Sequence, residues 1–239
     1  MSPGERVLDV GTGTGVVARA AQEAAGDGVV VGVDQSVPML EAGTRSVRLA
    51  AASAIDLPFR EATFDAVLAG FVLSHFPRLD TALFDVIRVL KPGGRLGATT
   101  WGETEDEFQL AWRELVEQVV PHEVLQDAVE RAMPNEERLR DARRLEGTLR
   151  DAGLHPVTVE RQEYRFVMRL DDYVDGRTTA ASGRFVRDML GDRDWPAFLE
   201  RARAVFRERF PDPLTDFREV LIAVATKPAD YQAGDVQGR

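Results

Sequence analysis

Short apolar runs alternate with amphipathic segments along the first hundred residues of this chain. Val7–Val10 is an apolar run, and Val16–Ala25 follows it with valines and alanines at helical spacing. Val29–Val33 lacks polar alternation, as a strand does in a parallel sheet that is covered on both faces. The alternation continues, with strands expected at 47–51, 64–69 and 95–100 and helices at 37–42 and 81–90. This β-α order predicts an α/β fold with a doubly wound, mostly parallel sheet.

The pattern changes after Trp101. A helix is expected over Glu105–Val120, and a mixed polar stretch then continues to about Pro134. Another helix is expected over Glu136–Ala152, because Gly153 follows it as a stop signal. The remaining chain is expected to contain a strand at 157–168, a mostly helical stretch at 171–210 with breaks at Gly176, Gly183, Gly191 and Pro196, and a last strand at 220–225.

The stretch Val7–Gly15 joins the first strand to the first helix through three glycines spaced two apart. Glycine has no Cβ and tolerates positive φ, so backbone can approach a ligand closely there. The first N–H groups of the following helix face the same place. In an open α/β sheet, ligands bind beyond the carboxyl ends of the strands, and Asp34 ends the second strand, where its carboxylate can accept both hydroxyls of a ribose.

The glycine spacing separates this turn from two common nucleotide sites. A dinucleotide fingerprint needs a third glycine at the sixth position, where this chain has Val16. A P-loop needs a lysine after the glycines, and none is present. The turn therefore predicts a ligand that has a ribose but no pyrophosphate.

Composition narrows the classes of partner. The net charge of -10 argues against nucleic-acid binding, which requires clustered Lys and Arg. No apolar run approaches the ~20 residues that span a bilayer, and the start of the chain has no signal-peptide core. The absence of cysteine excludes disulfides and thiolate sites and fits a reducing cytoplasm. No His and carboxylate cluster has metal-ligand spacing, so no metal is expected.

Several motifs occur together in order. Val7–Gly15, read Val-Leu-Asp-Val-Gly-Thr-Gly-Thr-Gly, resembles motif I of class I S-adenosylmethionine-dependent methyltransferases. The later motifs of that family resemble residues 33–40, 54–59, 64–67 and 88–96 of this chain. The resemblance covers roughly residues 5–102 and is greatest to the group that includes the ubiquinone and menaquinone biosynthesis methyltransferases. It implies S-adenosyl-L-methionine as cofactor and a Rossmann-like, mostly parallel seven-stranded sheet with a last antiparallel strand and a helical cap.

The resemblance also implies how the chain is divided. We expect a single methyltransferase domain over 1–239, with a cofactor-binding core at 1–102. Residues 103–150 and 171–212 are expected to form the helical cap over the substrate, and 231–239 a flexible tail.

The resemblance assigns the turn and the second strand to the ribose and methionine parts of the cofactor. Gly11, Thr12 and Gly13 would pass against the methionine part and the ribose. Asp9 would organise the turn, in part through water to the cofactor ammonium. Asp34 would hold the ribose hydroxyls.

The remaining cofactor contacts come from later strand ends. Gln35 and Met39 would flank the adenine, and Ser53 with the Ala54 backbone N–H would meet its edge. Gly70-Phe71 would run under the methionine chain. The family usually has Asp where this chain has Ser53, and a hydroxyl accepts from the adenine amino group without charge assistance.

A second departure concerns the start of the chain. Relatives usually carry one or two helices before the first strand that fold over the cofactor, whereas about six residues precede it here. Either such helices are missing from this sequence or another segment covers the cofactor.

Candidates for acceptor chemistry lie after the fourth strand. His75 is the catalytic candidate, because a His near the sulfonium methyl could take a proton from a hydroxyl nucleophile; it could equally line the pocket or pack structurally. Trp101, Phe108 and Trp112 could form an aromatic substrate surface, although Phe108 and Trp112 have the spacing of core residues. His122 is a lesser candidate for contact with substrate.

Together these features predict a cytoplasmic methyltransferase that acts on a small, partly apolar molecule, with O- or C-methylation ahead of N-methylation. A methyltransferase fold used for cofactor-assisted cyclisation and a non-catalytic, cofactor-binding regulatory subunit stay open, as does a homodimer. An NAD-dependent oxidoreductase is least favoured, because of Val16 and the Lys91-Pro92-Gly93-Gly94 turn.

Overall fold

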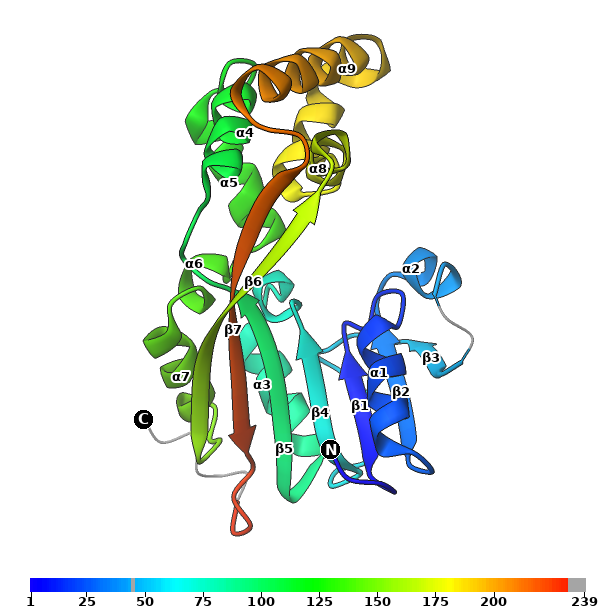
Figure 1. Ribbon diagram of the computed structural model, residues 1–239. Helices are drawn as coiled ribbons and strands as arrows, with labels where there is room; N and C mark the ends of the chain where they lie inside the picture. Colours follow the sequence, from blue (N-terminus) through cyan, green and yellow to red (C-terminus); the bar gives the residue numbers. More distant parts are fainter. Residues whose placement is uncertain (44–45, 232–239) are drawn as a thin grey trace. The chain divides into compact units, whose positions relative to one another are not determined.

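The computed structural model describes residues 1–43 and 46–231, which fall into two compact units (Figure 1). Unit 1 consists of Met1–Gly102, Asn135–Gln162 and the described part of Val220–Arg239. Unit 2 consists of Glu103–Pro134 and Glu163–Glu219. The chain therefore leaves unit 1 and returns to it twice.

Unit 1 is built on a seven-stranded sheet with the order β3-β2-β1-β4-β5-β7-β6. The five strands from β3 to β5 in this order run parallel to one another, whereas β7 pairs antiparallel with β5. The mostly parallel sheet with a last antiparallel strand is thus confirmed. The strands are β1 (Arg6–Val10), β2 (Val29–Asp34), β3 (Arg48–Ala51), β4 (Phe64–Gly70), β5 (Leu90–Trp101), β6 (Val157–Met168) and β7 (Leu214–Thr226).

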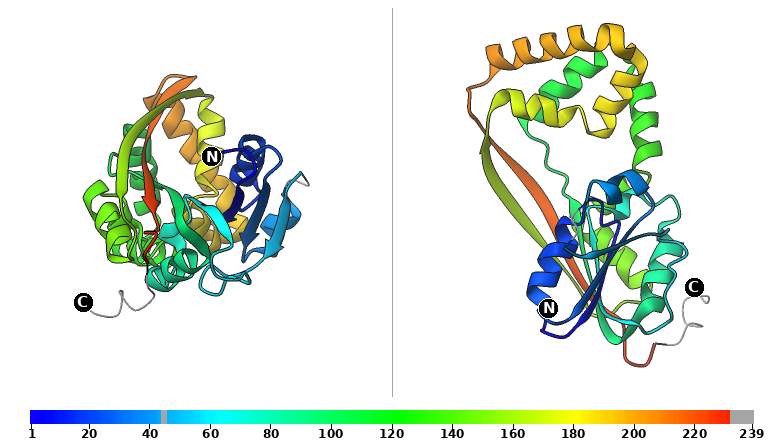
Figure 2. Two further views of the ribbon diagram at one scale, coloured as in Figure 1. Left: turned by 90° about the horizontal axis from the view of Figure 1, so that it is seen from below. Right: turned by 90° about the vertical axis from the view of Figure 1, so that its right-hand side faces the viewer.

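Helices cover both faces of this sheet, with α1 on one face and α3 on the other (Figure 2). Alternating residues of β1 explain this, since successive side chains of a strand point to opposite faces. Val7 packs with Ala18 and Ala21 of α1, whereas Leu8 and Val10 belong to the larger core that contains α3 and α7 residues. The helices of unit 1 are α1 (Val16–Ala25), α2 (Val37–Glu41), the 3-10 helix η1 (Leu73–His75), α3 (Leu79–Val89), α6 (Glu136–Leu139) and α7 (Ala142–Asp151).

Unit 2 is mainly helical and has a core of its own. Phe108 and Trp112 on one helix pack with Tyr173, Phe198 and Phe206 from the later helices. The helices of unit 2 are α4 (Glu107–Glu117), α5 (His122–Ala132), α8 (Leu170–Arg177) and α9 (Ala181–Arg209). Among the described helices, none is long and apolar enough to cross a membrane.

Two expectations about the middle of the chain are wrong. The stretch expected to be mixed and polar up to Pro134 contains the helix α5, whose apolar side is too narrow to identify because only Leu125 is buried. The single helix expected over Glu136–Ala152 is two helices, since Asp141 begins α7 by accepting the Arg144 N–H at 2.8 Å. Both helices belong to unit 1, and the cap expected at 103–150 stays a prediction.

The expected breaks at 171–210 are only partly correct. The chain leaves the helical conformation between α8 and α9 and at Gly191, where φ is 66°. Gly176 and Gly183 lie inside helices, and so does Pro196, which comes soon after the Gly191 kink. The last strand begins at Leu214, earlier than the expected residue 220. The tail expected at 231–239 lies outside the described residues beyond Tyr231.

Lys227 ties the end of β7 to the end of α3. Its Nζ is buried and donates hydrogen bonds to the carbonyl oxygens of Ile87, at 2.8 Å, and Leu90, at 2.7 Å. A cation at a helix carboxyl end satisfies carbonyls that lack intrahelical partners. Burial lowers the pKa of Lys227, which shows that its position is maintained against a desolvation cost.

We expect Lys227→Met to lower the free energy of unfolding by about 1–3 kcal/mol, because the variant keeps the aliphatic stem and removes both hydrogen bonds. Chemical denaturation measures this loss. Lys91→Met is the matched control, since Lys91 forms a partly exposed pair with Asp65 that should contribute less than about 1 kcal/mol. Equal losses in the two variants would show that Lys227 has no special role.

Candidate functional site

The carboxyl ends of β1, β2 and β4 meet where the strand order reverses. β1 lies between β2 and β4, so the loop after β1 is flanked by the loops after both neighbours. Such a reversal is where open α/β sheets bind their ligands. The residues expected at the site, from Asp9 to His75, all belong to unit 1.

The turn after β1 is closed by backbone hydrogen bonds to β2. The N–H groups of Gly11 and Thr12 both donate to the Val33 carbonyl, at 2.8 and 3.0 Å. Gly11, Gly13 and Gly15 have φ values of 68°, 56° and 82°, in the left-handed region that glycine adopts at low cost. Three glycines at alternate positions are therefore required by the path of the chain itself.

Residue 11 must be glycine for a second reason, which is the close packing of the loop after β4. A Cβ placed on Gly11 would lie 2.2 Å from Val72 Cγ2. A Cβ on Gly13 would lie 3.4 Å from Met39 Cε, an ordinary contact. Val72 thus fills the space beside Gly11, whereas a Cβ on Gly13 would meet only the end of the Met39 side chain.

Asp34, the last residue of β2, also binds the turn through its side chain. Its Oδ2 accepts the Gly13 N–H at 2.9 Å, and its Oδ1 accepts the Ser36 N–H at 2.8 Å. Each carboxylate oxygen can accept a second hydrogen bond. The two backbone donors therefore fix the orientation of the carboxylate and leave acceptor capacity for a ligand.

Asp9 bonds to a side chain of the turn, and its role in organising the turn stays a prediction. Its Oδ2 accepts the Thr12 hydroxyl at 2.6 Å, and only 1% of the residue is exposed. Burial raises the pKa of Asp9 to about 6, because the Thr12 hydroxyl and the Ala18 N–H offset the desolvation only in part. A carboxylate kept here at such a cost is typical of a functional site.

The loop after β3 lies beside Asp34. The Ala52 N–H donates to the Asp34 carbonyl at 3.0 Å, so the partly buried Ser53 and Ala54 follow directly. Gln35 and Met39 are exposed at the start of α2. Proximity of this loop to the turn agrees with the expected adenine side, and the roles of these residues stay predictions.

Sequence reasoning missed the anchor of this loop. Arg88 donates to the carbonyl oxygens of Leu57, at 2.9 Å, and Phe59, at 2.6 Å. Asp85 accepts from Arg88 Nε at 2.6 Å and also from the Leu57 N–H. The signal was present, because Asp85 and Arg88 are three residues apart on a helix, but pairing with a distant loop cannot be inferred from spacing.

The loop after β4 presents an exposed aromatic pair. Phe71 follows Gly70 and is held with φ at 53°, a conformation that non-glycine residues rarely adopt, by its N–H bond to the Thr99 carbonyl at 3.0 Å. Its ring stacks on Trp101 with centroids 4.2 Å apart, and the two residues are 37% and 43% exposed. Strain and exposure together suggest a contact surface for a ligand.

The other aromatic and histidine residues considered as site residues differ in location and in burial. Phe108 and Trp112, considered as a substrate surface with Trp101, are buried core residues of unit 2. His75 ends η1 and is exposed, and its catalytic role stays a prediction. His122 Nδ1 lies 2.8 Å from Glu117 Oε1 on the surface of unit 2.

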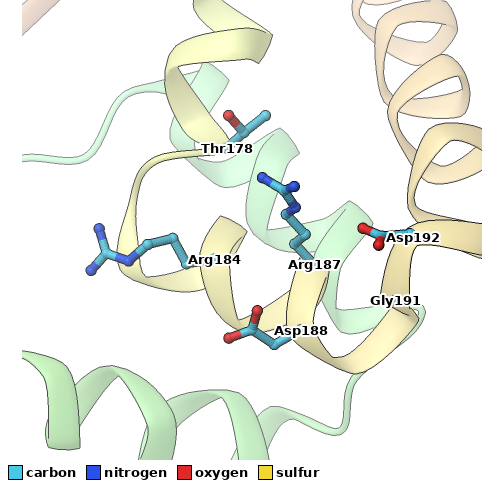
Figure 3. A pocket seen from close by; sticks show the side chains of 6 residues that line it. All are labelled: Thr178, Arg184, Arg187, Asp188, Gly191 and Asp192. Carbon is cyan, nitrogen blue, oxygen red and sulfur yellow. The ribbon is translucent and has the colours of Figure 1, made fainter.

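Unit 2 contains a hollow of about 450 Å³ that includes none of the expected site residues (Figure 3). Charged side chains surround it, with Arg187 extending toward Thr178 and Arg184 directed away (Figure 3). Its lining residues are Thr178, Arg184, Arg187, Asp188, Gly191 and Asp192. Within the described ranges, no group of three or more His, Cys, Asp and Glu side chains could hold a metal ion.

The packing of the turn predicts different costs for two alanine substitutions. Gly11→Ala and Gly13→Ala both place a Cβ at positive φ, which costs about 1–2 kcal/mol. Only Gly11→Ala also overlaps Val72, so we expect it to lower the free energy of unfolding by about 1–3 kcal/mol more. Equal losses in denaturant titrations of both variants would contradict this account of Gly11.

The buried Asp9 predicts a pH-dependent stability. An unfolded Asp ionises near its ordinary value of 3.8, whereas folded Asp9 keeps its proton to about 6, so folding loses free energy as pH rises between these values. We expect the stability advantage of Asp9→Asn over the wild type to grow by about 2 kcal/mol from pH 4.5 to 7.5, at ~1.4 kcal/mol per pKa unit.

Thermal and denaturant unfolding at both pH values measure that advantage. Asp65→Asn is the control, because the Lys91 ammonium and the Arg6 N–H hold the pKa of Asp65 below its ordinary value despite desolvation. An Asp9→Asn advantage that does not change with pH would contradict the raised pKa.

Comparison with known proteins agrees with this geometry. Residues 8–98 match the family described as a methyltransferase domain. A solved structure, the YcgJ protein from Bacillus subtilis, superposes with a TM-score of 0.58 at 21% identity and covers 95% of this chain and 93% of that one. This likeness confirms the fold.

Two curated relatives are more similar in sequence. Demethylmenaquinone methyltransferase from Corynebacterium kroppenstedtii is 44% identical over 39% of this chain and 41% of its own length. The ubiquinone/menaquinone biosynthesis C-methyltransferase UbiE from Rhizobium leguminosarum bv. trifolii is 31% identical over 65% of this chain and 67% of its own length. The chain spans only 41% to 57% of the length of the Corynebacterium kroppenstedtii relative and of two further demethylmenaquinone methyltransferases, from Symbiobacterium thermophilum and Thermus thermophilus. From the match to UbiE and to the domain family, the chain belongs to the class I S-adenosylmethionine-dependent methyltransferases of the ubiquinone and menaquinone biosynthesis type.

Proposed function

We propose that this protein transfers a methyl group from S-adenosyl-L-methionine to a small, partly apolar acceptor, at oxygen or carbon. The observation that carries the proposal is the pairing of Asp34 with the glycine turn. A carboxylate fixed by Gly13 and Ser36 N–H groups keeps acceptor capacity for two ribose hydroxyls. Val16 replaces the glycine that a pyrophosphate site needs, so the arrangement favours a nucleoside over a dinucleotide.

The residues around the turn fit such a cofactor. Asp34 would bind the ribose hydroxyls, and the backbone of Gly11, Thr12 and Gly13 would pass against the ribose and the methionine part. Asp9 would face the cofactor ammonium, in part through water, and a nearby positive charge would favour its ionised form. Binding would then relieve part of the cost of burying that carboxylate.

The adenine and the methionine chain would contact the remaining strand ends. Gln35 and Met39 would flank the adenine, while Ser53 and the Ala54 N–H would meet its edge. Gly70 and Phe71 would run under the methionine chain. The bonds from Arg88 to the loop at 57–59 support this arrangement, because they hold the loop without using the site residues themselves.

The cofactor supplies an electrophilic methyl group on a sulfonium, and the protein contributes position. Holding two reactants in line can lower a barrier by up to ~7–11 kcal/mol, so no conspicuous general base is required. His75 is our candidate to take a proton from a hydroxyl acceptor. The exposed, stacked rings of Phe71 and Trp101 would contact the apolar part of the acceptor.

The names of the relatives support a quinone-like acceptor. Because the chain spans only part of the length of those relatives, the identity of the acceptor is part of our proposal. A cofactor-assisted cyclisation and a non-catalytic binding role are the competing functions. Transfer of label from methyl-labelled S-adenosylmethionine to a demethylated quinone separates them, because only a methyltransferase leaves label in the product.

We expect Asp34→Asn to weaken S-adenosylmethionine binding at least about thirtyfold, because two charge-assisted hydrogen bonds to the ribose are worth roughly 2–3 kcal/mol or more. Isothermal titration calorimetry measures the Kd. Asp65→Asn, at the opposite end of β4, is the matched control and should leave the Kd unchanged. NAD serves as the second titrant and should give no heat with the wild type. An unchanged Kd in Asp34→Asn would remove Asp34 from the site.

A further inference from the structure

The backbone of Phe71 is held by two oxygen atoms of a single residue. The Phe71 N–H donates to the Thr99 carbonyl at 3.0 Å and to Thr99 Oγ1 at 3.2 Å. Thr99 belongs to β5 and pairs with Gly70, the last residue of β4. These two hydrogen bonds keep Phe71 at a φ of 53°, where a residue with a side chain is strained. The conformation of Phe71 therefore depends on one residue of the neighbouring strand.

The Thr99 hydroxyl and the Trp101 ring come from the same face of the sheet. Successive side chains of a strand point to opposite faces, so Thr99 and Trp101 share one face of β5, and Thr100 has the other. Thr100 Oγ1 donates to the Leu139 carbonyl at 2.9 Å, in the buried layer on that other face. The hydroxyl that holds Phe71 and the ring that stacks on it are thus on one side of β5.

A third apolar side chain lies close to this pair. A Cβ on Gly70, which directly precedes Phe71, would lie 3.1 Å from Val17 Cγ2. The same Cβ would lie 4.0 Å from Thr99 Oγ1, so the start of α1 reaches the side of the sheet that the hydroxyl occupies. Val17, Phe71 and Trp101 are between 37% and 43% exposed. Exposed apolar side chains at the edge of a sheet where ligands bind indicate a contact surface.

We propose that Thr99 positions the Phe71 ring on Trp101 and that the stacked pair binds a planar aromatic ring of the acceptor. This inference rests on the proposed function, because it assigns part of the acceptor to one edge of the same site. Aromatic rings gain specific stacked or edge-to-face contacts with one another beyond the burial of apolar area. A saturated ring of the same size gains only the apolar burial, so the exposed pair favours a planar acceptor.

Thr99 acts through Phe71 and is therefore a positioning residue. Without its hydroxyl, the Phe71 N–H keeps only the Thr99 carbonyl as acceptor. Phe71 can then relax toward the extended or helical conformations that residues with a side chain normally adopt. Either change turns the Phe71 ring away from Trp101. Loss of the Thr99 hydroxyl should therefore weaken binding of a planar ring.

Calorimetric titration of the full chain with naphthol, a planar bicyclic alcohol, and decalinol, its saturated counterpart, tests the subsite. The wild type should bind naphthol with about a threefold or greater preference over decalinol, as expected for an aromatic contact. Phe71→Leu should remove most of this preference. Thr99→Val should weaken naphthol binding about threefold, whereas Thr99→Ser, which keeps the hydroxyl, should bind naphthol as the wild type does.

A double-mutant cycle separates positioning from a merely structural role. In the Phe71→Leu background, Thr99→Val should have no further effect on naphthol affinity, because the ring through which Thr99 acts is gone. Thr100→Val is the matched control. It removes a hydroxyl from the opposite face of the same strand and should leave naphthol affinity unchanged.

Tryptophan fluorescence reports the position of the Phe71 ring without any ligand. Trp101 is exposed, whereas Trp112 and Trp195 are buried, so acrylamide should quench mainly Trp101. Thr99→Val should make this quenching more efficient, because displacement of the Phe71 ring uncovers the indole. Thr99→Ser should be quenched as the wild type is.

Titration of the wild type with S-adenosylmethionine distinguishes a failure of this inference from a failure of the proposed function. Cofactor binding without a preference for naphthol over decalinol overturns the subsite and leaves the proposed function in place. A naphthol preference without cofactor binding supports the subsite and contradicts the proposed function. Equal effects of Thr99→Val with and without the Phe71 ring, or unchanged quenching in Thr99→Val, overturn the positioning role.

Discussion

The hydrogen bond from the Gly13 N–H to Asp34 Oδ2 is the contact on which the candidate site depends. It joins the turn after β1 to the end of β2 and orients the carboxylate that we propose to bind the ribose. The turn can reach Asp34 only because its glycines adopt positive φ and because Gly11 leaves room for Val72 from the loop after β4. Three neighbouring strands of the sheet thus fix one carboxylate.

The candidate site also lowers the stability of the folded protein, because it contains the buried carboxylate of Asp9. A buried carboxylate whose pKa is raised to about 6 lowers the stability of the folded protein at neutral pH. Binding sites commonly retain such groups because a ligand completes their interactions. Unit 1 therefore contains a polar group whose burial a stability argument alone does not explain.

Much of unit 1 could be predicted from the sequence because local signals and the fold agree there. The apolar runs, the glycines and the stop signals place the strands and α1, and the seven-stranded sheet follows from the family resemblance. The proximity of Asp9, Gly13, Asp34 and Ser53 follows as well, since parallel strands bring their carboxyl ends together. Contacts between distant segments could not be predicted. Arg88 to the Leu57 carbonyl and Val72 against Gly11 join residues that no spacing rule connects.

Unit 2 was less predictable because its signals are weak or ambiguous. The apolar side of α5 is narrow, and Pro196 and Gly183 lie inside helices that their residue types argue against. Trp112 could be assigned to a substrate surface or a core from its spacing, and burial decides for the core. The ion pair between Arg218 and Asp106 could not be predicted, because the two residues come from separate segments of the chain.

A crystal structure with S-adenosylhomocysteine bound tests the central claim most directly. Our account predicts both ribose hydroxyls on the Asp34 carboxylate, with the bond from the Gly13 N–H to Oδ2 retained. It also predicts that the backbone of Thr12 and Gly13 lies against the ribose and the amino-acid part. A ligand bound elsewhere, or a ribose that does not contact Asp34, would contradict it.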